Sequence, residues 1–119
     1  MKLKMSFLSL LLLVSGCATV AKQQVVLQPA QSSETVLTKH AIAINLDTGA
    51  DRKIKADSKW TYIGKINKGK VYKPVDDVFS IEGTQQYEAY LVISGGKIVG
   101  FYLPASSNFS PLTQQVMFP

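Results

Sequence analysis

Few side chains in this chain of 119 residues could carry out chemistry. There is one cysteine, Cys17, and one histidine, His40. Nucleophilic catalysis needs a serine or cysteine beside a histidine that a carboxylate orients, and a metal site needs further His or Cys ligands at a suitable spacing. The sequence has neither pattern, so we expect no catalytic residue, no metal site and no small-molecule cofactor. A hydrolase that uses His40 is the remote alternative.

Two pairs of carboxylates lie close together in the sequence, Asp47 with Asp51 and Asp76 with Asp77. The first pair flanks Gly49 in a predicted turn, where Asp side chains commonly accept hydrogen bonds from the backbone. Adjacent strand residues point to opposite faces, so Asp76 and Asp77 would not act together. Neither pair is expected to form an acid/base couple, and we predict that the domain is not an enzyme.

Cys17 ends an N-terminal segment that is typical of exported proteins. Lys2 and Lys4 supply positive charge, residues 5–14 are apolar apart from two serines, and two small residues precede the cysteine. This order is that of a secretory signal peptide. As a helix, the apolar run of ten residues would be about 15 Å long, which is too short to span a bilayer comfortably.

The tetrapeptide Val-Ser-Gly-Cys at residues 14–17 resembles the lipobox of bacterial lipoproteins, although the usual first residue is Leu. The resemblance implies cleavage between Gly16 and Cys17 by the lipoprotein signal peptidase. It also implies diacylglycerol in thioether linkage on Cys17 and an acyl chain, such as palmitate, on the new amine. The match covers about 17 of the 119 residues. The alternative is an ordinary signal peptide with an unmodified cysteine.

Removal of residues 1–16 leaves 103 residues, the size of one small domain. The resemblance implies a lipid anchor in the cell envelope, and Ala18 resembles the pattern sorted to the outer membrane, facing the periplasm. After the cysteine, the chain to residue 35 is rich in Ala, Gln, Ser and Lys, with one apolar cluster at residues 25–27 and no periodic apolar face at residues 28–33. This composition predicts a lipidated cysteine and flexible tether at residues 17–35, ahead of a β-domain at residues 36–119. Residues 25–27 could instead add an edge strand to the domain.

Alternation of apolar and polar residues begins after the tether. It predicts one half-buried strand over residues 36–46, with His40 on the apolar face. A turn around Gly49 and a returning strand at residues 53–55 would complete a hairpin. Further strands are expected at residues 59–66, 70–73 and 78–81.

The clearest hairpin signal is a Gly-Gly pair at positions 95 and 96 between two β-rich runs, residues 87–94 and 97–103. The expected register places Ile93 opposite Ile98 and Val92 opposite Val99. Both faces of this hairpin are largely apolar, which predicts a central place in a sheet.

The end of the chain is expected to form a loop at residues 105–113 and a last short strand at residues 114–118. The mature chain shows no helical periodicity. We therefore predict an all-β fold, a small antiparallel β-barrel or β-sandwich that follows a cleaved signal helix and a flexible tether.

The net charge of the chain is +5, and its basic residues cluster between positions 52 and 73. The basic residues of this segment are Arg52, Lys53, Lys55, Lys59, Lys65, Lys68, Lys70 and Lys73. They form either a solvated face or a surface that binds anionic lipid or glycan. Trp60, Tyr62 and Tyr72 lie among them and are expected in the core rather than on a recognition surface.

Because the sequence has a predicted lipid anchor and no set of catalytic residues, we predict a non-catalytic envelope lipoprotein that is held at the membrane by its lipid. Its β-domain would bind a partner protein or an envelope component, and binding of anionic lipid or glycan through the basic segment is the alternative. Nucleic acid is not expected as a partner of an exported, acylated protein.

Overall fold

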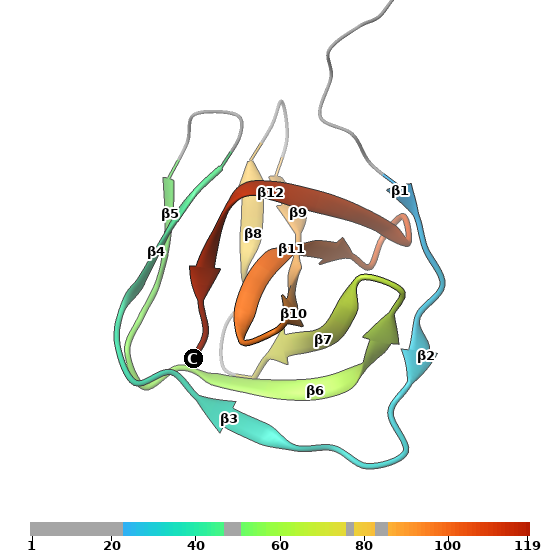
Figure 1. Cartoon of the computed structure of the whole chain (residues 1–119), viewed down its shortest axis with the longest axis horizontal. Helices are drawn as coiled ribbons and strands as arrows, with labels where there is room; N and C mark the ends of the chain where they lie inside the picture. Colours follow the sequence, from blue (N-terminus) through green and yellow to red (C-terminus); the bar gives the residue numbers. More distant parts are fainter. Residues whose placement is uncertain (1–22, 47–50, 76–77, 83–85) are drawn as a thin grey trace, which may run out of the picture.

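The structure of the protein is a computed structural model that describes residues 23–46, 51–75, 78–82 and 86–119 (Figure 1). The regular structure in these segments is entirely β-strand, which confirms the predicted all-β class. Within the same segments, no helix has the length and apolarity that crossing a membrane requires. The predicted signal peptide and Cys17 lie outside the described residues, as do Asp47, Asp76 and Asp77.

One curled antiparallel sheet forms the body of the domain (Figure 1). Its strands in spatial order are β1 (Gln23–Gln24), β12 (Asn108–Met117), β11 (Lys97–Leu103), β10 (Tyr90–Ser94), β7 (Gly69–Pro74), β6 (Lys59–Ile66) and β2 (Gln28–Pro29). β3 (Thr35–Leu37) pairs with the first half of β6. Two hairpins stand apart from this sheet: β4 (Ile42–Asn45) with β5 (Asp51–Ile54), and β8 (Ser80–Glu82) with β9 (Gln86–Glu88).

Residues 23–30, which we call the N-terminal strap, join the two edges of the curled sheet. β1 pairs with β12 and β2 pairs with β6, although only three residues separate β1 from β2. The strap thus caps two edges whose backbone groups would otherwise be unpaired. From Gln23 onward the chain is therefore paired into the domain, within the residues 17–35 that were expected to form the tether. The strand residues are those of β1 and β2, rather than residues 25–27.

Apolar side chains are buried on both faces of the sheet. One cluster lies between the sheet and the two hairpins and includes Ile44, Trp60, Tyr72, Phe79, Leu91, Ile98 and Phe101. The other includes Ile66, Val71, Tyr90, Val92, Tyr102 and Phe109, with Val25 and Leu27 of the strap packed against it. This two-sided burial confirms the central position predicted for the β10–β11 hairpin.

The strand predicted over residues 36–46 is in fact two strands, β3 and β4, with a bend between them. Thr38 explains the interruption, because only 1% of its surface is exposed. Its Oγ1 donates a hydrogen bond to the Lys55 carbonyl (2.7 Å) and accepts one from the Ser58 N–H (2.9 Å). The bend turns His40 to the solvent, so its predicted place on the apolar face is wrong.

The β10–β11 hairpin turns at the Gly-Gly pair, and both glycines have positive φ (60° and 75°). Ile93 pairs with Ile98 as expected. A bulge then leaves Val99 without an opposite residue, so that Val92 pairs with Gly100 and the rest of the predicted register is offset by one.

β12 occupies most of the stretch that was expected to be a loop. The connection from β11 is a turn at residues 104–107, which Ser107 closes in the left-handed region (φ 56°). Pro111 lies inside β12 and pairs with Gly100, next to an irregularity in the register. Bulges are among the few places where a strand accepts proline, so Pro111 does not end β12 here.

Candidate functional site

The eight basic residues of the predicted binding surface divide into separate groups. Arg52, Lys53, Lys55 and Lys59 line one pocket. Lys65, Lys68 and Lys70 surround the β6–β7 turn, beside the Gly-Gly turn of the β10–β11 hairpin. Lys73 places its ammonium 5.9 Å from the centroid of the Tyr90 ring. The fold therefore presents the basic segment as distinct surfaces rather than as one continuous patch.

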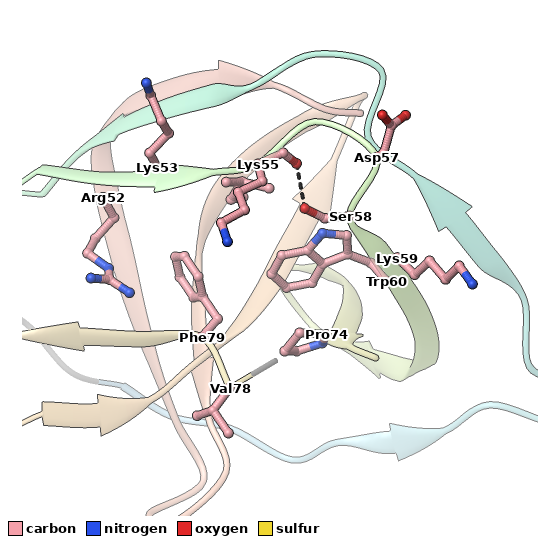
Figure 2. A pocket seen from close by; sticks show the side chains of 11 residues that line it. Arg52, Lys53, Lys55, Asp57, Ser58, Lys59, Trp60, Pro74, Val78 and Phe79 are labelled. Atoms are coloured by element: carbon pink, nitrogen blue, oxygen red, sulfur yellow. Dashed lines mark hydrogen bonds between the residues drawn. The ribbon is translucent and has the colours of Figure 1, made fainter. Parts of the chain in front are cut away.

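The first group lines a pocket of about 310 Å³, which we call the basic pocket (Figure 2). Its other lining residues are Ile54, Asp57, Ser58, Trp60, Pro74, Val78 and Phe79. Four of the charged side chains are basic and one is acidic, so the local field favours an anionic occupant. The walls come from β5, the start of β6, the end of β7 and the segment before β8, which only the tertiary fold brings together.

Aromatic rings form part of the wall of the basic pocket (Figure 2). Trp60 packs edge-on to Phe79, with 5.8 Å between ring centroids, and Phe79 stacks on Phe101 at 5.9 Å. The guanidinium carbon of Arg52 lies 5.3 Å from the centre of the Phe79 ring. Such a cation–π contact contributes on the order of 1 kcal/mol and limits the freedom of the guanidinium. Arg52 is therefore held in place before any partner arrives.

The turn that carries Lys55 and Asp57 is held by Thr38. The Asp57 N–H donates to the Thr38 carbonyl (2.8 Å), and the Thr38 N–H donates to the Ser58 carbonyl (3.0 Å). Within the turn, Ser58 Oγ donates to the Lys55 carbonyl (Figure 2). Asp57 adopts a left-handed conformation (φ 62°), which Asp tolerates better than most residues. These bonds fix the rim of the pocket.

Two buried donors at the basic pocket have no hydrogen-bond partner among the described residues, Arg52 Nε and Trp60 Nε1. Each such donor costs about 1–3 kcal/mol, and groups of this kind are rare in folded proteins. Trp60 is only 3% exposed, so bulk water does not reach its indole nitrogen. Both unmet donors belong to residues that line this one pocket.

Exposed apolar side chains border the basic pocket, a feature that the sequence did not reveal. The large hydrophobic residues with high exposure in the described segments are Val26, Leu37, Val75, Val78 and Met117. Val78 lines the pocket, and two others neighbour its lining residue Lys59: Leu37 pairs with Lys59, and the Val75 N–H donates to the Lys59 carbonyl (3.0 Å). Exposed apolar groups that gather in one place are typical of interaction sites.

The aromatic residues of the basic segment are mainly structural. Trp60 and Tyr72 are buried and Tyr62 is half-buried, which confirms the expectation of core packing. Burial raises the pKa of Tyr72, and the nearby charge of Glu34 raises it further. Burial also raises the pKa of Tyr90, to which Glu88 contributes through its charge and a hydrogen bond.

His40 is exposed and is not among the residues that line the basic pocket. Across the described residues, no group of three or more His, Cys, Asp and Glu side chains is arranged to hold a metal ion. Comparison of the chain with protein-family models, with curated proteins and with solved structures finds no match. A functional assignment must therefore be argued from the site itself.

Proposed function

We propose that this chain is a lipid-anchored protein of the bacterial cell envelope whose β-domain binds an acidic protein partner without catalysing a reaction. The anchor is supported by the signal-like N-terminus and the Val-Ser-Gly-Cys motif that ends at Cys17. The binding role is supported by one observation above all, the exposed apolar rim around a pocket with an excess of basic side chains.

The composition of the site favours a protein over a small anion. Arg is among the residues most often found at the energetic centres of protein interfaces, and Arg52 lines the basic pocket. A small anion would need only the charges, whereas exposed Leu37, Val75 and Val78 offer apolar area beyond the pocket. A partner segment with carboxylates and apolar side chains would use both features.

The backbone of β5 offers a way to hold such a segment. Within the described residues β5 pairs with β4 on one side and with no strand on the other. An extended peptide can add to a free edge through main-chain hydrogen bonds. Its acidic side chains would then lie near Arg52, Lys53 and Lys55, which belong to or directly follow β5.

The test uses the acylated chain and two charge-reversal variants of it. Each is crosslinked in the native envelope, and the proteins captured with each are compared. Lys53→Glu with Lys59→Glu changes two exposed pocket residues, and Lys97→Glu with Lys39→Glu makes the same charge change at exposed positions that do not line the basic pocket. We expect the pocket variant to lose a partner that the control variant retains. That partner should also be released as salt rises from about 0.05 to about 0.3 M, because the Debye length then shortens by a factor of about 2.4. Equal capture by both variants would contradict the assignment of the pocket.

A further inference from the structure

We infer that the outer face of the N-terminal strap is the surface through which the domain rests on the membrane. The inference rests on the proposed lipid anchor and adds an orientation to it. The occupant of this face is the headgroup layer of an anionic bilayer, the one into which the acyl chains on Cys17 would insert.

The length of chain between the anchor and the domain keeps the strap close to the lipid. Five residues separate Cys17 from Gln23, so the Cα atoms of these two are at most roughly 20 Å apart. Gln23 and Gln24 are held to β12, where they pair with Phe109 and Asn108. Gln24 Nε2 also donates to the carbonyls of the β11–β12 turn, at 3.0 and 3.2 Å. Because the attachment is short and Gln23 is fixed to the domain, the start of the strap stays within roughly 20 Å of the anchored residue.

The strap presents an apolar side chain to the outside. Val25 and Leu27 are half-buried and pack against the cluster that contains Phe109, whereas Val26 between them is 79% exposed. The adjacent backbone is fixed, since the Val25 N–H donates to the Ser107 carbonyl (3.0 Å) and the Ala30 N–H donates to the Ile63 carbonyl (2.9 Å). The fold therefore fixes the side chain of Val26 in an outward position.

Basic side chains lie beside Val26. A shallow depression is lined by Gln24, Val25, Val26, Gln28, Lys65, Ile66 and Asn67, without an acidic side chain. Exposed Lys68 follows directly in the β6–β7 turn. An apolar side chain flanked by lysines is the chemistry of contact with an anionic membrane surface, in which the apolar group enters the headgroup region and the ammonium groups meet phosphates.

The basic pocket lies on the far side of the domain from the strap. Trp60 and Ile66 are at opposite ends of β6, about 20 Å apart along an extended strand. Figure 1 shows the same separation, with β1 and β2 at the right-hand edge and the β4–β5 hairpin at the left. A domain that rests on its strap therefore turns the basic pocket away from the bilayer and toward a partner. The two ends of the basic segment then have different roles.

The experiment measures how close two positions come to the lipid in the acylated full-length chain on vesicles of phosphatidylglycerol and phosphatidylcholine. Val26→Cys and Lys53→Cys each add one reactive thiol, because the thioether blocks Cys17, and both replaced side chains are exposed. The thiol is labelled with bimane, and the vesicles carry doxyl-labelled lipids that quench bimane at short range. We expect position 26 to lose most of its fluorescence and position 53 to lose little.

Charge variants test the role of the lysines. Lys65→Glu with Lys68→Glu should reduce quenching at position 26 to the level seen on pure phosphatidylcholine, whereas Lys53→Glu with Lys55→Glu should leave it unchanged. Emission from Trp60, the single tryptophan, shows whether each variant is folded.

Several outcomes would overturn the inference. Equal quenching at both positions in protein that floats with the vesicles would contradict the orientation and leave the anchor in place. Self-quenching between labels at position 26 without quenching by lipid would identify a second copy of the chain as the occupant. Protein that does not float with vesicles would remove the anchor itself, whereas partner capture through the basic pocket is tested independently.

Discussion

Replacement of Thr38 by valine tests whether one buried hydroxyl holds the rim of the basic pocket. Thr38→Val keeps the shape of the side chain and removes the group that donates to the Lys55 carbonyl and accepts from the Ser58 N–H. The Lys55 carbonyl still accepts a bond from Ser58 Oγ, so it stays satisfied. The Ser58 N–H loses its acceptor in a partly buried place. Loss of a hydrogen bond that leaves a buried N–H without an acceptor costs about 1–3 kcal/mol, so we expect the free energy of unfolding to fall by that amount.

The assay is urea denaturation of the full chain followed by the fluorescence of Trp60, which is buried in the folded state. Thr38→Ser is the matched control, because it retains the hydroxyl and loses one methyl group at a cost of about 1 kcal/mol or less. The valine variant should also bind the acidic partner less tightly, since the turn loses both bonds of the hydroxyl and keeps only its backbone bonds to residue 38. A valine variant as stable as the parent, or a serine variant less stable than the valine one, would refute the role assigned to the hydroxyl.

Three further predictions concern the strap, the tyrosines and the anchor. Gly64→Ala should lower the free energy of unfolding by about 1–3 kcal/mol and make the strap sensitive to limited proteolysis. The reason is that a Cβ at position 64 would overlap the Gln28 carbonyl, and the residue has a φ of 154°. Gly96→Ala is the control, because its Cβ would meet no atom within 4 Å, and it should leave the strap protected. Tyr72 and Tyr90 have raised pKa values in the folded state, so the stability that they contribute is complete below the unfolded pKa of about 10 and is lost as the pH rises through the folded values. Unfolding followed by circular dichroism should show this loss above pH 10, and Tyr72→Phe should reduce it; a loss unchanged in Tyr72→Phe and Tyr90→Phe would exclude these two groups as its cause. Cys17→Ser should abolish fractionation with the membrane, and a fully processed variant that still fractionates there would show that Cys17 is not the anchor.

Much of the strand pattern could be predicted because it depends on local sequence. β6 lies where alternation and aromatic content placed it, and the β10–β11 hairpin turns at the predicted glycines. The errors arose where a distant segment changed the local preference. Thr38 bonds to residues 17 and 20 positions away and interrupts a strand, and Pro111 is tolerated in β12 because it lies next to an irregularity in the pairing with β11.

The strap shows that domain organisation, too, could not be predicted from local sequence alone. Residues 23–30 were expected to belong to a flexible tether, yet Gln23, Gln24, Gln28 and Pro29 pair with two strands that lie far along the chain. A short segment can be ordered by the unpaired backbone groups of a sheet edge, and those edges do not exist until the sheet has formed.

By itself, the sequence determined the all-β class, the positions of most strands and the identity of the basic residues, because these depend on side-chain type and short-range alternation. The motif around Cys17 likewise led to the proposal of an anchor from its sequence alone. Only the tertiary structure decided how the basic residues are grouped. It placed Arg52 and Lys59 in one pocket with Phe79 and the exposed Val78, and it left Lys65 and Lys68 beside the strap. The physical reason is that a curled sheet brings together strand ends that are distant in the chain, so neighbours in the sequence can face opposite sides of the molecule.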